Sequence, residues 1–98
     1  MVTSQPRAAV VYHPLKTDLA SLRAAVLRQE AKAGWASSLW LETTQDDAGQ
    51  QLTRRALSEG VSIVLASGGD GTLRAVAETL RGSRTPLAIV PQGTGNLL

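Results

Sequence analysis

Short runs of consecutive apolar residues alternate along the chain with longer stretches in which apolar residues recur every three or four positions. The short runs predict β-strands, and the spaced stretches predict amphipathic helices. The order is βαβαβαβ, which predicts an α/β fold with a parallel sheet, right-handed crossovers and helices on both faces. The predicted strands are residues 8–12, 39–42, 61–66 and 87–90, and the predicted helices are residues 18–32, 50–59 and 73–81.

Residues that stop strands or cap helices stand at several of these boundaries. Pro14 disfavours helix directly before it, so the first strand is expected to end in a turn. Thr17 or Asp18 can cap the first helix, and Gly34 stands where that helix is expected to end. The run 61–66 is nearly all apolar, which is typical of a central parallel strand covered on both faces.

Composition narrows the function classes. The 98 residues are 43% hydrophobic and 18% charged, which indicates a globular chain and one small domain or part of a larger one. The absence of cysteine excludes disulfides and thiolate chemistry, and a single histidine excludes a histidine-rich metal site. The net charge of +2 comes from scattered residues, so we expect no nucleic-acid partner. No apolar run is long enough to span a bilayer and no signal peptide is recognisable, so we expect a cytoplasmic protein.

The sharpest motif is a glycine-rich segment, Gly68-Gly69-Asp70-Gly71-Thr72, between a predicted strand and a predicted helix. Glycine lets a ligand approach the backbone closely, and the N-terminus of the following helix favours phosphate. The segment is neither a Walker A loop nor Gly-x-Gly-x-x-Gly. The alternative is an ordinary tight turn in which Asp70 or Thr72 only caps the helix.

A second glycine-rich segment, residues 91–96, follows the last predicted strand and contains Gly93, Thr94, Gly95 and Asn96. If the third and fourth strands are neighbours, both segments open onto the same edge of the sheet. Backbone N–H groups, threonine hydroxyls and the asparagine amide could then enclose a polyphosphate. The alternative is a turn-rich connection that binds no ligand.

Together the two motifs resemble the catalytic domain of diacylglycerol kinases, shared with sphingosine and ceramide kinases and bacterial lipid kinases. The resemblance implies transfer of the γ-phosphoryl group of ATP to a lipid hydroxyl, with Mg²⁺ as cofactor. It also implies that residues 1–98 are the N-terminal nucleotide-binding domain, incomplete here and without the second, β-rich domain that supplies the lipid site. We therefore expect the 98 residues alone to be inactive, and leave open peripheral membrane contact through absent segments.

The resemblance also assigns site residues. It implies that residues 68–72 border the nucleotide phosphates, with Asp70 either holding Mg²⁺, directly or through water, or orienting the acceptor hydroxyl. Family members carry Asn-Pro after the first strand, where this chain has His13-Pro14, so His13 is a candidate nucleotide contact that departs from the family pattern. A threonine after the second strand is also expected to touch the nucleotide, and of Thr43 and Thr44 we favour Thr44.

Other interpretations stay open at this point. Asp46-Asp47 is interpreted as charge that complements a helix N-terminus rather than as a metal pair. Lys16 lies close enough to the end of the first strand to meet phosphate, but a solvated side chain is favoured. More distant relatives with the Gly-Gly-Asp-Gly motif include NAD kinases and 6-phosphofructokinases, so a kinase with a non-lipid acceptor such as NAD or a sugar phosphate is one alternative. A truncated, non-catalytic nucleotide-binding module is the other, and it draws support from His13.

Overall fold

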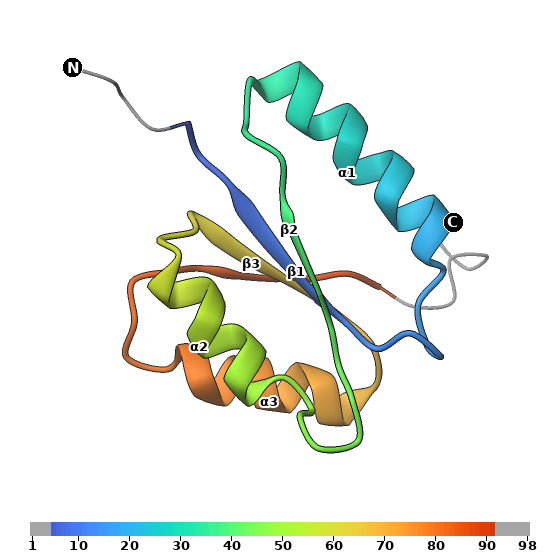
Figure 1. Ribbon diagram of the computed structural model, residues 1–98, viewed down its shortest axis with the longest axis vertical. Coiled ribbons are helices and arrows are strands. Elements are labelled where there is room, and N and C mark those ends of the chain that lie inside the picture. The colour runs from blue at the N-terminus through green and yellow to red at the C-terminus, as the bar shows by residue number, and fades with distance from the viewer. Residues whose placement is uncertain (1–4, 92–98) are drawn as a thin grey trace.

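The computed structural model describes residues 5–91 and confirms the predicted order of elements. It contains a four-stranded parallel sheet with α1 on one side and α2 and α3 on the other, so the predicted α/β fold with helices on both faces is confirmed (Figure 1). The elements are β1 (Ala8–Tyr12), α1 (Leu19–Ala33), β2 (Leu39–Glu42), α2 (Gln50–Ser58), β3 (Ile63–Ser67), α3 (Asp70–Leu80) and β4 (Leu87–Ile89).

The strand order is β2-β1-β3-β4, with every neighbouring pair parallel. From β1 the chain passes through α1 to β2 at one edge, and then returns through α2 to β3 on the other side of β1. The connections after β1 and β3 therefore leave toward opposite faces of the sheet (Figure 1). Such a switch point opens a crevice at the carboxyl ends of the strands, where ligands bind in open α/β sheets.

Side chains alternate along the strands and form two apolar layers. On β1, Ala9 and Val11 pack toward α2 and α3, whereas Val10 and Tyr12 pack toward α1. The layer under α2 and α3 is the larger, because two amphipathic helices cover that face. Its buried residues are Ala9, Val11, Leu41, Ala56, Val61, Val64, Ala66, Val76 and Leu80. This larger layer is aliphatic, as expected for a chain without phenylalanine, whereas the layer under α1 also contains Tyr12, with Trp40 packed against it.

Three predicted boundaries were wrong in the same region. β3 begins at Ile63 and includes Ser67, and α3 begins at Asp70 instead of Leu73. The N–H of Leu73 donates to the carbonyl of Gly69 (3.1 Å), which closes the first helical turn. The glycine-rich motif is therefore the end of a strand followed directly by the first turn of a helix. Asp70 lies inside that turn, and no side chain caps α3.

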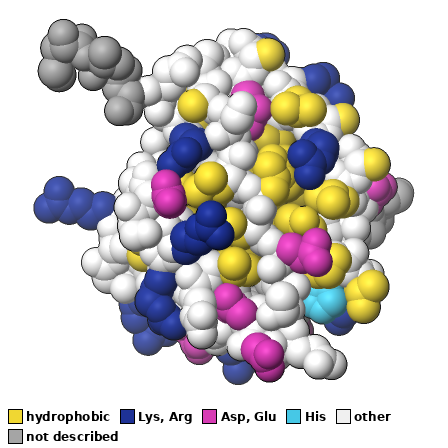
Figure 2. Space-filling model, in the orientation of Figure 1, with side chains coloured by type: hydrophobic (Ala, Val, Ile, Leu, Met, Phe, Trp, Pro, Cys, Tyr) yellow, Lys and Arg dark blue, Asp and Glu magenta, His cyan; other side chains and the backbone are white. Residues whose placement is uncertain are grey.

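Charged side chains are mixed with other types on the surface. On the face shown in Figure 2, basic side chains are interspersed with acidic and hydrophobic ones. Within residues 5–91, every helix is too short or too polar to cross a bilayer.

Candidate nucleotide site

Backbone hydrogen bonds that continue past the strands align the carboxyl ends of β2, β1 and β3 with one another. The N–H of Thr43 donates to the carbonyl of Tyr12 (2.9 Å), and the N–H of His13 donates to the carbonyl of Ser67 (2.8 Å). These bonds extend the parallel pairing by one residue on each side of β1. The three loops that follow therefore begin at the same edge of the sheet. The segments after β1, β2 and β3 therefore meet at the switch point.

The loop after β1 is a tight turn fastened to the end of β3. The N–H of Lys16 donates to the carbonyl of His13 (3.1 Å), with Pro14 at the second turn position, which its fixed φ suits. The N–H of Leu15 donates to Nδ1 of His13 (3.1 Å), so in its neutral form the imidazole carries its proton on Nε2. Thr17 Oγ1 lies 3.0 Å from Ser67 Oγ, which ties the far end of the loop to the same strand end.

The glycines of the motif allow β1, β3 and α3 to approach one another. A Cβ on Gly68 would lie 2.8 Å from Thr72 Oγ1 and 2.9 Å from the Cβ of His13, closer than real Cβ contacts. A Cβ on Gly69 would lie 3.0 Å from Nζ of Lys16. By contrast, a Cβ on Gly71 would meet nothing within 4 Å. Gly68 is therefore required for packing, whereas Gly71 faces open space.

A cavity of about 260 Å³ lies where these segments meet. Its residues come from the loops after β1 and β2 and from the N-terminal end of α3. They are His13, Lys16, Thr43, Thr44, Ala48, Gly69, Gly71 and Thr72. The first N–H groups of a helix have no partner within the helix and carry partial positive charge, which favours an anion in this cavity.

Most of the residues predicted from the first motif and the strand ends lie together here. Beyond the five candidates His13, Thr44, Gly69, Gly71 and Thr72, the cavity includes Thr43 and Lys16. Thr43 is 5% exposed, whereas Thr44 is exposed and its Oγ1 accepts the N–H of Asp47 (3.2 Å). Both threonines therefore line the cavity, whereas the sequence analysis favoured Thr44 alone.

Two candidates lie beside the cavity, not in its lining. Gly68 is buried beneath it, against Thr72 and His13. Asp70 is exposed and lies between Gly69 and Gly71, which both line the cavity.

The second glycine-rich segment is only partly placed. β3 and β4 pair in parallel, and the N–H of Val90 donates to the carbonyl of Ala66 (2.9 Å). The predicted adjacency of these strands is confirmed, and Pro91 follows β4 at the same edge of the sheet. Residues 93–96, the predicted Gly93, Thr94, Gly95 and Asn96, lie outside the described residues.

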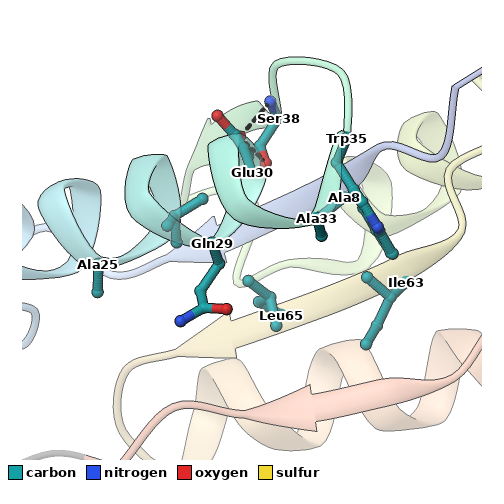
Figure 3. A pocket seen from close by; sticks show the side chains of 10 residues that line it. Ala8, Ala25, Gln29, Glu30, Ala33, Trp35, Ser38, Ile63 and Leu65 are labelled. Atoms are coloured by element: carbon teal, nitrogen blue, oxygen red, sulfur yellow. Dashed lines mark hydrogen bonds between the residues drawn. The ribbon is translucent and has the colours of Figure 1, made fainter.

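A larger groove of about 340 Å³ lies between the C-terminal half of α1 and the face of the sheet that this helix covers (Figure 3). Trp35, Ile63 and Leu65 give it an apolar lining. Its carboxylate, Glu30, accepts hydrogen bonds from the N–H and the hydroxyl of Ser38. With this composition the groove is not suited to phosphate, despite its volume.

Comparison with protein families decides between the possible phosphate-binding folds. The model of the family described as diacylglycerol kinase catalytic domain matches residues 7–98. The chain belongs to the diacylglycerol kinase catalytic domain family. The resemblance stated from the two glycine-rich motifs is therefore confirmed.

Individual relatives in this family carry lipid kinase names. The chain is 38% identical over 95 residues to a probable lipid kinase, YegS-like, from Pseudomonas fluorescens strain Pf-5, covering 95% of this chain and 31% of that protein. It is 37% identical over 95 residues to a protein of the same name from Pseudomonas syringae pv. tomato, covering 95% of this chain and 30% of the relative. The chain thus spans about a third of the length of these relatives.

The acidic residues named from the sequence differ in whether they could hold a metal ion. Among the described residues no three His, Cys, Asp or Glu side chains are grouped as a metal site. Mg²⁺ in nucleotide-dependent enzymes is held by one or two carboxylates together with substrate phosphates and water. Asp70, a carboxylate on the first turn of α3 beside the cavity, fits that demand.

Of the pair Asp46-Asp47, the second residue has the structural role that the sequence indicated. The carboxylate of Asp47 accepts the N–H groups of Gly49 (2.9 Å), Gln51 (3.2 Å) and Leu52 (3.1 Å) at the start of α2. Asp47 therefore caps that helix, and the interpretation as helix N-terminal charge is confirmed. For Lys16 the sequence favoured a solvated side chain over a phosphate contact, and the structure places its side chain against Gly69 in the lining of the cavity.

Proposed function

We propose that the chain is the nucleotide-binding part of an ATP-dependent lipid kinase. In the natural protein it would contribute to transfer of the γ-phosphoryl group to a lipid hydroxyl. The observation that carries the proposal is the polar cavity at the switch point. Its lining includes Gly69, Gly71 and Thr72 of the glycine-rich motif, at the N-terminal end of α3. Membership of the diacylglycerol kinase catalytic domain family supports the same reaction.

The geometry suits phosphate binding because several donors converge on one small cavity. The first N–H groups of α3 lack partners within the helix. Thr43, after β2, and Thr72, on α3, add two hydroxyl-bearing residues to the lining. Phosphoryl transfer depends mainly on positioning and on neutralising charge, with little covalent work for the protein. Binding and positioning the phosphates in the cavity would therefore be the main contribution of this chain to phosphoryl transfer.

Transfer breaks the bond between the γ-phosphorus and the oxygen bridging to the β-phosphate, and forms a bond to the lipid oxygen. The lipid hydroxyl loses its proton, and ADP leaves. Mg²⁺, held by the phosphates and Asp70, would neutralise charge on the oxygens. Asp70 would alternatively orient the acceptor hydroxyl and accept its proton. Both roles require a carboxylate, and both are compatible with its exposed place beside the cavity.

The non-catalytic alternative drew its support from His13 in place of asparagine. In the structure, Nδ1 of His13 accepts the N–H of Leu15, two residues further along the chain. An asparagine side chain forms the same kind of turn through its oxygen. Histidine therefore maintains the loop that borders the cavity, and the substitution alone does not favour loss of function.

We infer that catalysis also requires protein beyond these 98 residues, since the relatives are about three times as long. The lipid site and any contact with a membrane surface would lie there. The natural protein that contains these residues is therefore the right material for a kinase assay. Binding of Mg²⁺-ATP can be measured on the 98-residue chain.

The decisive experiment compares Asp70→Asn with Asp46→Asn, a matched change at an exposed acid outside the cavity. With diacylglycerol in mixed micelles, Asp70→Asn should lower kcat by at least about 100-fold while ATP still binds, and Asp46→Asn should leave kcat unchanged. Parallel assays with NAD and with sugar phosphates test the non-lipid acceptor. Failure of the wild-type chain to bind ATP, or turnover of a non-lipid acceptor alone, would overturn the proposal.

A further inference from the structure

The loop that follows β1 holds Lys16 in a defined place. Its first residue, His13, donates its N–H to the carbonyl of Ser67, and Thr17 Oγ1 lies 3.0 Å from the hydroxyl of the same serine. Between them, the N–H of Lys16 donates to the carbonyl of His13 and closes the turn. Both ends of the loop are thus fixed to the end of β3, the strand that leads into α3.

The side chain of Lys16 extends from this turn onto the backbone of Gly69. A Cβ built on Gly69 would lie 3.0 Å from Nζ of Lys16 and 3.2 Å from its Cδ, so the lysine occupies the space that any other residue at position 69 would fill. Gly69 is the N-cap residue of α3. The ammonium group therefore lies beside the end of the helix where N–H groups lack intrahelical partners.

The charge of the cavity lining agrees with this placement. Among the described residues, the lining includes one lysine and no carboxylate. A lysine and a helix N-terminus on adjacent sides of a 260 Å³ cavity both favour an anion, and their effects on a phosphate group would reinforce each other.

We propose that Lys16 binds a phosphate group of the nucleotide, and that Gly69 lacks a side chain because Lys16 must lie across it. The inference rests on the proposed nucleotide-binding function and adds a specific residue to it. It assigns Lys16 the phosphate contact, where the sequence alone favoured a solvated side chain.

The chain offers a close control, because Lys16 and Lys32 are its two lysines, and Lys32 lies in the last turn of α1, away from the cavity. Methionine keeps an unbranched side chain, one atom shorter than lysine, and removes the charge. Calorimetric titration with Mg²⁺-ATP should show a Kd raised roughly 10- to 100-fold in Lys16→Met and within about twofold of wild type in Lys32→Met. Mg²⁺-ATP should also protect Lys16, and not Lys32, from acylation measured by mass spectrometry.

Gly69→Ala provides an independent test, since the alanine methyl would displace the flexible end of Lys16. It should weaken ATP binding in the wild-type background and have a smaller effect in Lys16→Met, whereas direct obstruction by the methyl would give equal losses in both. Equal affinity of Lys16→Met and wild type, with ATP still bound, would overturn this inference and leave the proposed function standing. Absence of ATP binding by wild type would overturn both.

Discussion

Replacing Gly68 with alanine tests whether the glycine-rich motif is required for packing as well as for ligand binding. The new Cβ would lie 2.8 Å from Thr72 Oγ1, 3.0 Å from Thr72 Cβ and 2.9 Å from His13 Cβ. Two of these are Cβ atoms fixed to the backbone, and Thr72 is a buried β-branched residue with little freedom at χ1. Relief therefore requires backbone movement between β1, β3 and α3, which falls in the upper part of the range for overpacking, about 2–3 kcal/mol.

For a domain of this size, that loss corresponds to a Tm lower by roughly 10–20 °C in thermal unfolding followed by circular dichroism. The matched control is Gly71→Ala, the same substitution three positions later on α3, where the methyl would meet nothing within 4 Å. Alanine favours helix over glycine, so this variant should be as stable as wild type or more stable by up to about 1 kcal/mol. Equal changes of Tm in the two variants would refute the close-packing argument.

Three further predictions concern polar groups outside the cavity. Asp47→Ala removes the side-chain cap of α2 and should cost about 1 kcal/mol in urea unfolding, whereas Asp46→Ala should change stability by less than about 0.5 kcal/mol; equal effects would contradict the capping role. Backbone and side-chain hydrogen bonds from the next turn hold the pKa of Asp18 below 3.8, so its stabilising effect is present above about that pH and lost as pH falls through the lowered pKa. Asp18→Ala should therefore be less stable than wild type at neutral pH, and the difference should disappear in acid; a constant difference would contradict it. Burial, then hydrogen bonding to Glu42 and its charge, raises the pKa of Tyr12 above 10.0. Since Tyr12 is the only tyrosine, absorbance titration should show a midpoint above 10.0 that falls in Glu42→Gln, and an unchanged midpoint would exclude the Glu42 contact.

The sequence predicted most accurately the elements whose ends carry local signals. β1 and β2 begin and end at the predicted residues, since each is a short apolar run bounded by polar or turn-forming residues. The start of α1 was within one residue, because the Asp18 cap is read from the adjacent sequence. The start of α3 was missed because its first turn contains Gly71, a residue with low helix propensity, and tertiary packing determines its conformation.

Some residues of the candidate site can likewise be predicted from local sequence, and others cannot. Residues 68–72 are recognisable because three glycines clustered between a strand and a helix indicate a close approach of the backbone to a ligand or to a neighbouring segment. That Thr43 and Lys16 line one cavity depends on which loops meet at the switch point, which follows from the strand order and not from the local sequence. Periodicity predicts the elements, and it contains no information on the order β2-β1-β3-β4.

The three glycines of the motif satisfy three different physical demands. Gly68 allows close packing of strand ends and helix, Gly69 provides space for Lys16, and Gly71 leaves the cavity open. Alanine substitution should therefore separate the demands: stability falls at position 68, ATP affinity falls without loss of Tm at position 69, and any loss at position 71 is confined to ligand binding. A motif that served the ligand alone would instead give three variants with wild-type stability, so unfolding and binding measured on the same three proteins distinguish the two cases.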